Sequence, residues 1–179
     1  LANSHYEIVA APKASIEAAA AIARAQGYRV DVLGDSLEGE AHKVAGFHAE
    51  MALDAKRRGE KLAIMSGGEL TVTVRGNGAG GPNQEYALGL AIALNGASGI
   101  SALAGDTDGT DGGGGNADDP AGAIVFPDTL ARANALNQNA ANFLANNDSS
   151  GFFRPLGDLI NCGPTQTNVN DFRVILVDP

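Results

Sequence analysis

An aspartate-rich loop is the strongest candidate for chemistry in this sequence. It spans residues 105–112 (GDTDGTDG) and directly follows an apolar stretch. Its three carboxylates repel one another unless a cation, hydrogen-bond donors or water compensate them. Mg²⁺ suits this role, because it often takes only one or two carboxylates together with substrate phosphates. We therefore predict a metal site whose candidate ligands are Asp106, Asp108 and Asp111.

Two alternatives remain open for this loop. A calcium-binding EF-hand loop fits poorly, because Thr110 occupies its fifth position and Ala117 its twelfth, where a bidentate Glu belongs. In the second alternative the aspartates bind no ion and instead cap turns and the start of a helix, as Asp commonly does.

A second polar region combines residues 66–69 (SGGE) with a glycine-rich loop at residues 75–85 (RGNGAGGPNQE). Gly76, Gly78 and Gly81 satisfy the G-x-G-x-x-G pattern of dinucleotide-binding loops. The preceding stretch alternates polar and apolar residues, however, and no acidic residue closes a following strand at a distance of about 20 positions. The more general prediction is that backbone N–H groups beside a helix N-terminus bind a phosphate or a carboxylate. A flexible hairpin loop without function is the alternative.

A third polar loop spans residues 161–171 (NCGPTQTNVND) and offers hydroxyl and amide groups without a positive charge. Such groups bind a sugar acid or a phosphate by hydrogen bonds rather than by ion pairs. A fourth polar turn at residues 144–149 (LANNDS) has residues that begin helices, so we predict a structural role for it. Cys162 is predicted to be a small packed residue. His48 is predicted to be a half-buried helix residue rather than a base.

Charge and composition argue against several classes of protein. The formal charge of −9 provides no basic surface for a nucleic acid or an anionic membrane. The charge is uneven, since residues 1–61 carry eight basic and nine acidic side chains whereas residues 62–179 carry four and twelve. No apolar run reaches the roughly 18 residues of a membrane span, and the N-terminal residues lack signal-peptide character. We expect a cytoplasmic protein, and a first residue other than Met indicates a processed or truncated piece.

Alternating strands and helices are predicted for the first segment. The predicted order is strand 7–10, helix 16–26, strand 28–33, helix 37–58 and strand 61–65. Gly27 supplies the end of the first helix. The second helix has Val44, Phe47, Met51 and Ala55 on one face, which defines its apolar side. Strands that alternate with helices in this way pair in parallel through right-handed crossovers.

The second segment is predicted to add strands of another kind. Residues 70–75 alternate polar and apolar residues, which predicts an antiparallel or edge strand. Pro82 begins a helix that is apolar nearly all round over residues 86–94 and is therefore buried on two sides. Further strands are predicted at residues 100–104, 123–126 and 173–177, with helices near 128–133 and 137–144. The predicted fold class is α/β, a mixed-sheet α/β sandwich preceded by a βαβαβ connecting segment.

Taken in order, the polar loops resemble the C-terminal MOFRL domain of the glycerate 2-kinase family. The resemblance rests on five motifs, at residues 66–76, 80–85, 105–112, 145–149 and 163–171. It covers residues 61–179, and residues 1–60 resemble the segment that connects this domain to the family's N-terminal Rossmann-like domain. The resemblance implies that the N-terminal domain, which holds a family lysine thought to act in catalysis, is missing from this chain.

The resemblance implies ATP-dependent phosphorylation of D-glycerate at its 2-hydroxyl, with ATP and Mg²⁺ bound in a cleft between two domains. Phosphoryl transfer needs positioning, a metal ion and a cation for the transferring charge more than a covalent nucleophile. Arg75 is the candidate catalytic cation, because residues 62–179 contain only three other arginines. The resemblance gives substrate and phosphate binding to Gly67, Gly68, Glu69, Gly81, Asn83, Gln84, Glu85, Thr165, Thr167 and Asn168, and the metal to Asp106, Asp108 and Asp111.

Three positions depart from the family's pattern. Many members have Arg where this chain has Pro82, which moves the expected arginine role to Arg75. Gln166 stands where Gly is common. Residues 112–119 form a longer and more glycine-rich stretch than usual, so we expect the aspartate loop to close differently.

Three functions remain open for this chain. The first is the C-terminal part of a glycerate 2-kinase, inactive alone because half of the cleft is missing, with its N-terminal domain and D-glycerate as partners. The second is a hydroxypyruvate reductase that uses NAD(P)H, since many family members are named as hydroxypyruvate reductases. The third is a non-catalytic interaction domain. The sequence leaves a homodimer open.

Overall fold

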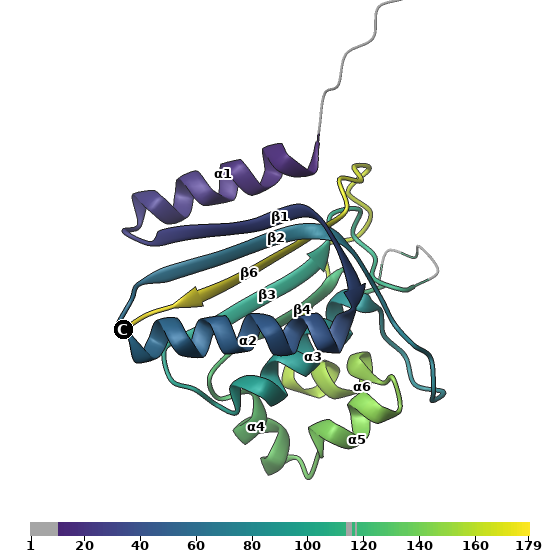
Figure 1. Ribbon diagram of the computed structural model, residues 1–179. Helices are drawn as coiled ribbons and strands as arrows, with labels where there is room; N and C mark the ends of the chain where they lie inside the picture. The colour runs from purple at the N-terminus through teal and green to yellow at the C-terminus, as the bar shows by residue number, and fades with distance from the viewer. Residues whose placement is uncertain (1–10, 114–115, 117) are drawn as a thin grey trace, which may run out of the picture.

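The computed structural model describes residues 11–113, 116 and 118–179, within which one six-stranded mixed sheet carries helices on both faces (Figure 1). The strands are β1 (Arg29–Glu40), β2 (Leu62–Thr71), β3 (Ile100–Asp106), β4 (Gly122–Val125), β5 (Leu159–Ile160) and β6 (Asp171–Val177), in the spatial order β1-β2-β6-β3-β4-β5. The helices are α1 (Pro12–Ala25), α2 (Ala41–Arg57), α3 (Pro82–Leu94), α4 (Thr129–Ala135), α5 (Ala140–Ala145), α6 (Ser149–Phe153) and the 3-10 helix η1 (Arg154–Leu156). The mixed α/β sheet confirms the predicted fold class. The strand predicted at residues 7–10 lies outside the described residues.

Strands β1 and β2 pair in parallel through the α2 crossover, as predicted. Both strands are longer than predicted. Residues 37–40, which were expected to begin the helix, continue β1 and pair with β2, so that α2 begins only at Ala41. The separate strand predicted at residues 70–75 is wrong, because Leu70 and Thr71 are the end of β2 and residues 72–75 lie beyond it. The expected boundary at residue 60 therefore falls between two strands of one sheet.

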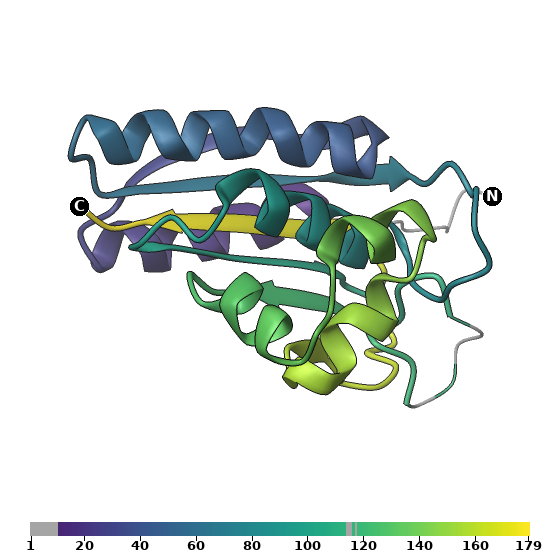
Figure 2. The same cartoon turned by 90° about the horizontal axis from the view of Figure 1, so that it is seen from below.

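The other strand pairs are antiparallel. β6 lies between β2 and β3, and β4 joins β3 to the short β5. Because β2 and β3 both run antiparallel to β6, their C-terminal ends lie at the same end of the sheet as the start of β6. The two views in Figures 1 and 2 place the loops that follow β2 and β3 at this end. The sheet therefore brings together loops that are far apart in the sequence.

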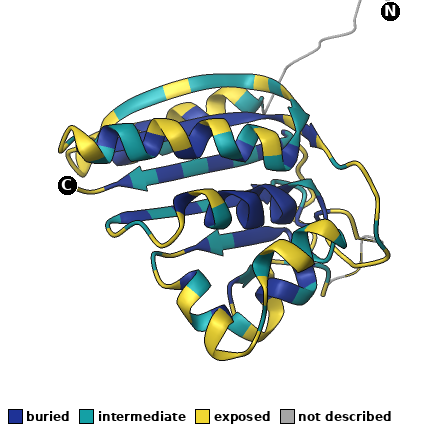
Figure 3. Ribbon diagram, turned by 60° about the horizontal axis from the view of Figure 1, so that its bottom comes forward, coloured by how far each residue is buried: buried dark blue, intermediate teal, exposed yellow. Residues whose placement is uncertain are grey.

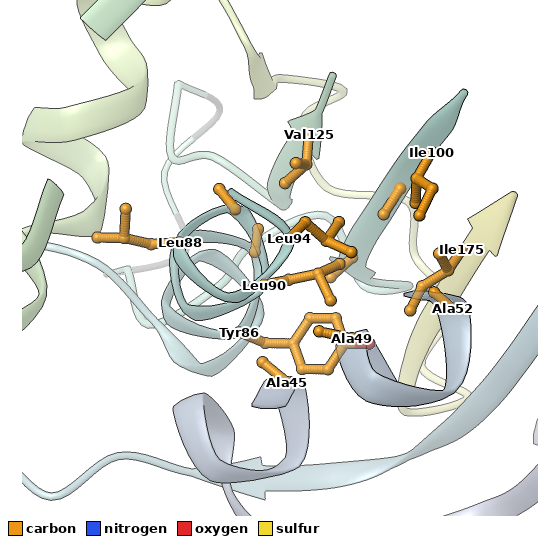
Figure 4. Close-up of a cluster of buried hydrophobic side chains, with 14 of the residues drawn as sticks. Ala45, Ala49, Ala52, Tyr86, Leu88, Leu90, Leu94, Ile100, Val125 and Ile175 are labelled. Carbon is orange, nitrogen blue, oxygen red and sulfur yellow. The ribbon is translucent and has the colours of Figure 1, made fainter. Parts of the chain in front are cut away.

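Helix α3 lies at the centre of the molecule and is buried over most of its length (Figure 3). Pro82 is its first residue and its apolar residues face several neighbours, which confirms the prediction of burial on two sides. In Figure 4 the side chains of Leu90 and Leu94 point toward Ile100 of β3, and the Tyr86 ring lies beside Ala49 of α2. This packing fixes the position of the α3 N-terminus, where several candidate residues lie.

The apolar side predicted for α2 is wrong in part, since Ala55 is buried and Val44 packs against the core but the two largest residues do not. Phe47 is 68% exposed and Met51 is 37% exposed, whereas the buried face is formed by Ala41, Ala45, His48, Ala49, Ala52 and Ala55. A Cβ atom added to Gly89 of α3 would lie 3.0 Å from the Cα atom of His42. The two helices therefore approach too closely for large side chains, and small residues occupy the contact.

Helix α1 covers the opposite face of the sheet, as Figure 1 shows. Ile16, Ala20 and Ala23 pack against Ala63 and Met65 of β2. The helix ends as predicted, with a glycine at residue 27 whose φ is +81°. Short helices near the predicted positions complete the fold. In the part of the chain that the structure describes, no helix is long and apolar enough to cross a membrane.

Candidate functional site

A buried ion pair holds together the end of the sheet where the loops meet. Arg173 is 1% exposed and donates from Nη1 to Asp171 Oδ2 at 2.7 Å. It also donates from Nη2 to the Gly67 carbonyl at 2.6 Å and the Gly68 carbonyl at 3.3 Å, and from Nε to Ser66 Oγ at 3.2 Å. The start of β6 is thereby bonded to the end of β2.

The two glycines of the Ser-Gly-Gly-Glu segment fit into this packing because they lack side chains. Gly68 has a φ of +95°, and a Cβ atom there would overlap the backbone of Leu37 in β1. A Cβ atom on Gly67 would crowd the Asp171 carbonyl at 3.2 Å. Glu69, by contrast, is exposed on β2. The segment is therefore a tightly packed part of the sheet end, and only Glu69 of the three predicted binding residues reaches the surface.

Asp111 caps the N-terminus of α3. Its Oδ1 accepts from Asn83 N at 2.9 Å and its Oδ2 from Gln84 N at 2.8 Å, and both side-chain amides donate to the same carboxylate. Burial raises the pKa of Asp111, although these hydrogen bonds oppose the shift. A Cβ atom on Gly81 would overlap this residue, so a glycine there lets the aspartate close on the helix. Asp111 therefore fits the alternative in which an aspartate caps the start of a helix. Both of its carboxylate oxygens accept hydrogen bonds from α3.

Asp108 lies against the third polar loop, and Asp106 accepts from Asp108 N at 3.0 Å. Thr165 N donates to the Asp108 carbonyl at 3.0 Å, and Val169 N donates to Thr107 Oγ1 at 2.9 Å. Between the two loops lies a hollow of about 390 Å³, which is lined by Asp108, Thr110, Pro164, Gln166, Thr167 and Asn168. The structure therefore brings together two loops that the sequence predicted separately.

This hollow has the donors that Mg²⁺ prefers. Burial, and then the nearby Asp108 and Asp171 carboxylates, raise the pKa of Asp106 to about 6, so a cation there would offset unfavourable charge. The Thr110 Oγ1 atom has no hydrogen-bond partner among the described residues. Nowhere in the described part of the chain do three His, Cys, Asp or Glu side chains form a group that could hold a metal. Of the three predicted metal ligands, Asp108 lines the hollow, where its carboxylate fits a magnesium site that takes its other ligands from phosphate oxygens.

The glycine loop is bonded to the turn at residues 146–148. Arg75 N and Gly76 N donate to Asn147 Oδ1 at 2.7 Å and 3.0 Å, and Gly78 N donates to the Asn146 carbonyl at 3.0 Å. Asp148 also accepts from Gly151 N and thereby caps α6, which confirms a structural role for the fourth turn. The N–H groups of residues 75–79, which were expected to bind an external phosphate, thus have acceptors within the chain.

Arg75 lines a second hollow, of about 270 Å³, between the start of α2 and helices α3 and α5. Its guanidinium is largely exposed and lies 3.8 Å from the Glu40 carboxylate. Glu85 is buried in the same hollow, where its two oxygens lie 3.2 Å from His42 Nδ1 and 3.0 Å from Asn147 Nδ2. Arg75 and Asp108 therefore line different hollows of this chain.

The remaining predicted residues have structural partners. Thr165 Oγ1 donates to backbone carbonyls and accepts from Thr167 N at 3.3 Å, and Asn168 Oδ1 accepts from Asn170 N at 3.0 Å. Cys162 is exposed, so the prediction of a packed residue is wrong. His48 is more deeply buried than predicted and lies 2.8 Å from the Tyr86 hydroxyl.

The pairing of Asp171 with Arg173 was not predicted from the sequence. The two residues stand two positions apart in an otherwise apolar strand, which places their side chains on the same face of the sheet. A charged pair at this spacing inside an apolar strand is a signal for a buried ion pair, since neither charge is stable alone there.

The chain is similar in sequence and in fold to known proteins. The sequence model of the MOFRL family matches residues 62–171. A protein of Agrobacterium vitis named "Putative hydroxypyruvate reductase" is 47% identical over 95% of this chain and 39% of its own length. The D-glycerate 2-kinase of Thermotoga maritima is 35% identical over 99% of this chain and 42% of its own length. A crystal structure of glycerate kinase from the same organism superposes with a TM-score of 0.89 over 98% of this chain and 42% of that one.

The chain spans less than half the length of these relatives. The family match, however, covers more than half of the chain and includes the sheet end, the α3 N-terminus and the aspartate loop. The chain belongs to the MOFRL family.

Proposed function

We propose that this chain is the C-terminal part of a glycerate 2-kinase, which transfers the γ-phosphoryl group of ATP to the 2-hydroxyl of D-glycerate. In this reaction the bond between the γ-phosphorus and the β–γ bridging oxygen breaks, a new bond to the 2-oxygen forms, and the hydroxyl proton leaves. The observation that carries the proposal is the polar hollow between the aspartate loop and the third loop. Kinase relatives that align over almost the whole chain support it.

The residues of this hollow would serve phosphoryl transfer in different ways. Asp108 would hold Mg²⁺, which when bound offsets the charge of phosphate oxygens, and Asp106 would support Asp108 by accepting from its backbone N–H. Thr167 and Asn168 offer a hydroxyl and an amide to the substrate, and Thr165 keeps their loop against Thr107. We assign no metal to Asp111, because its carboxylate caps α3.

The second hollow would supply the positive charge. Arg75 is exposed and extends from the glycine loop, and it would stabilise the negative charge of the transferring phosphoryl group. The α3 N-terminus would then hold the loops around the two hollows in place through its packing and hydrogen bonds. The predicted residues in it are Gly81, Asn83, Gln84 and Glu85.

The full activity would require the N-terminal portion that the relatives contain. Arg75 and Asp108 line separate hollows that are open to solvent, and phosphoryl transfer needs both charges around one pair of substrates. We therefore propose that residues 1–60 connect to an N-terminal domain that closes over residues 61–179, and that the isolated chain is inactive.

A reductase function has weaker support. It rests on the names of two relatives that are 47% and 42% identical. A dinucleotide-binding loop presents its N–H groups and a helix N-terminus to a pyrophosphate. Here Gly76 and Gly78 donate to the turn at residues 146–148, and the α3 N-terminus is capped by Asp111.

The test is an assay of the full-length protein with ATP, Mg²⁺ and D-glycerate, in which ADP formation is measured. We expect glycerate-dependent ADP formation, and a fall in kcat of about 100-fold for both Arg75→Ala and Asp108→Ala. Asp128→Ala is the control, because Asp128 is exposed and follows β4 at the end away from the aspartate loop. Absence of ADP formation, or full activity in both variants, would contradict the proposal. NAD(P)H oxidation with hydroxypyruvate would instead favour the reductase.

A further inference from the structure

Arg173 makes contacts that a cation buried only for packing would not need. Its guanidinium donates to one carboxylate, two backbone carbonyls and one hydroxyl, and it lies 5.7 Å from the centroid of the Tyr86 ring. The acceptors come from the end of β2 and the start of β6, and the ring comes from α3. One side chain thus contacts the three elements that surround the sheet end.

Its partner Asp171 extends the connection to the α3 N-terminus. Asp171 Oδ1 accepts from Asn83 Nδ2 at 2.7 Å, and Oδ2 accepts from Leu70 N at 3.4 Å. Asn83 in turn donates to Asp111 in the aspartate loop. Hydrogen bonds therefore run without interruption from the Ser-Gly-Gly-Glu segment through Arg173 and Asp171 to both the α3 N-terminus and the aspartate loop.

Stability alone does not account for this pair. Removing two charges from water costs free energy that their attraction only partly offsets, and apolar residues of similar volume often stabilise such a site equally well. A planar guanidinium can bond a carboxylate and neighbouring carbonyls in fixed directions, which an ammonium group cannot reproduce. The geometry of Arg173 therefore suits a side chain that sets the relative positions of several backbone segments.

We propose that Arg173 is a positioning residue, which holds the Ser-Gly-Gly-Glu segment, the α3 N-terminus and the aspartate loop in register for phosphoryl transfer. The proposal rests on the proposed function. In the described part of the chain Arg173 lines neither hollow, so it acts through Asp171, Asn83 and the Gly67 and Gly68 carbonyls rather than on the substrate. A misplacement of about 1 Å in such a site costs about 100-fold in rate.

The test compares Arg173→Lys with Arg132→Lys in the full-length protein. Arg132 is a matched control, because it also pairs with a buried aspartate, Asp158, at 2.7 Å, but lies in α4 outside the loop network. At a temperature well below unfolding, we expect Arg173→Lys to lower kcat/KM for D-glycerate about 100-fold and Arg132→Lys to change it less than about twofold. We expect the larger loss of melting temperature in Arg173→Lys, because the Arg173 side chain is 1% exposed and the Arg132 side chain 32%, so activities are compared where both variants are folded. Equal activity of the two variants would overturn the proposal.

A double variant covers the case in which Arg173→Lys does not fold. Arg173→Met combined with Asp171→Asn leaves no unpaired buried charge and conserves the side-chain volumes approximately. We expect this protein to fold and to lose activity to the same extent, since the Gly67 and Gly68 carbonyls lose their donor. Wild-type activity in the folded double variant would overturn the proposal.

Hydrogen exchange separates this proposal from the proposed function. The amides of residues 66–70 and 83–85 should exchange faster in Arg173→Lys than in wild type, and at the wild-type rate in Arg132→Lys. If the wild-type protein does not phosphorylate glycerate, the kinase assignment fails while this exchange pattern still supports the positioning role. Exchange at residues 66–70 that is equal in both variants would overturn the positioning role whether or not the protein is a kinase.

Discussion

Replacing Asp111 by Ala should destabilise the chain even when no metal is present. The carboxylate accepts four hydrogen bonds from Asn83 and Gln84, two from backbone N–H groups and two from side-chain amides. Loss of a helix N-cap costs about 1 kcal/mol, and each buried donor left without an acceptor costs about 1–3 kcal/mol. Because the vacated space lets water reach some of these donors, we expect the free energy of unfolding to fall by about 3 kcal/mol.

The assay is urea denaturation of the chain in EDTA, followed by circular dichroism. Asp108→Ala is the matched control, because the Asp108 side chain accepts one hydrogen bond, from Thr110 N at 2.9 Å, and faces the hollow. Its loss should be about 1 kcal/mol. A loss below about 1 kcal/mol for Asp111→Ala, or a loss that occurs only when Mg²⁺ is present, would refute the assignment of Asp111 as a helix cap.

Three further predictions concern other parts of the fold. Burial, and then the charge of Arg173, lower the pKa of His48 from 6.5 to about 4. Because the folded protein favours the neutral ring, the free energy of unfolding should fall by about 3 kcal/mol as the pH decreases from 6.5 to 4. His48→Gln should remove this part of the pH dependence in urea denaturation, and an unchanged slope would refute it. Gly68→Ala should lower the free energy of unfolding, measured by thermal unfolding, by about 3 kcal/mol, because a Cβ atom there would overlap Leu37. Gly27→Ala is the control and should lower it by about 1 kcal/mol, because a Cβ atom there has no neighbour within 4 Å among the described residues. Asn147→Ala removes the acceptor of two N–H groups of the glycine loop, so amide exchange at residues 75–76 should accelerate at least tenfold, and unchanged exchange would contradict the described loop contact.

The elements that were predicted well are those in which local pattern and tertiary burial agree. Helix α3 has Pro82 at its start and apolar residues on all sides, and its sequence alone indicates a helix buried from more than one direction. Helix α2 shows the opposite case. Its large apolar residues lie outside and its alanines inside, because the close approach of α3 at Gly89 leaves room only for small side chains. Hydrophobic periodicity cannot detect a contact that is set by size.

The strand ends were also hidden from local pattern. Residues 34–40 contain two glycines and several polar side chains, and they are extended because they pair with β2 rather than because of their own preferences. In the candidate site, the polar loops were indicated by composition and spacing. Their partners were not, since the bonds from Asp111 to Asn83 and from Arg173 to Gly67 join positions far apart in the sequence. Such pairs depend on sheet order, which the sequence alone did not determine.

The position of the transferred phosphoryl group tests the proposed function most directly. Phosphorus NMR of the products formed by the full-length protein from ATP, Mg²⁺ and D-glycerate distinguishes the possible phosphate esters of glycerate. We predict a single new resonance, that of 2-phosphoglycerate, which appears about 100-fold more slowly when Asp108 is replaced by Ala. A product phosphorylated at the 3-hydroxyl, or no phosphoglycerate at all, would contradict the proposed glycerate 2-kinase function.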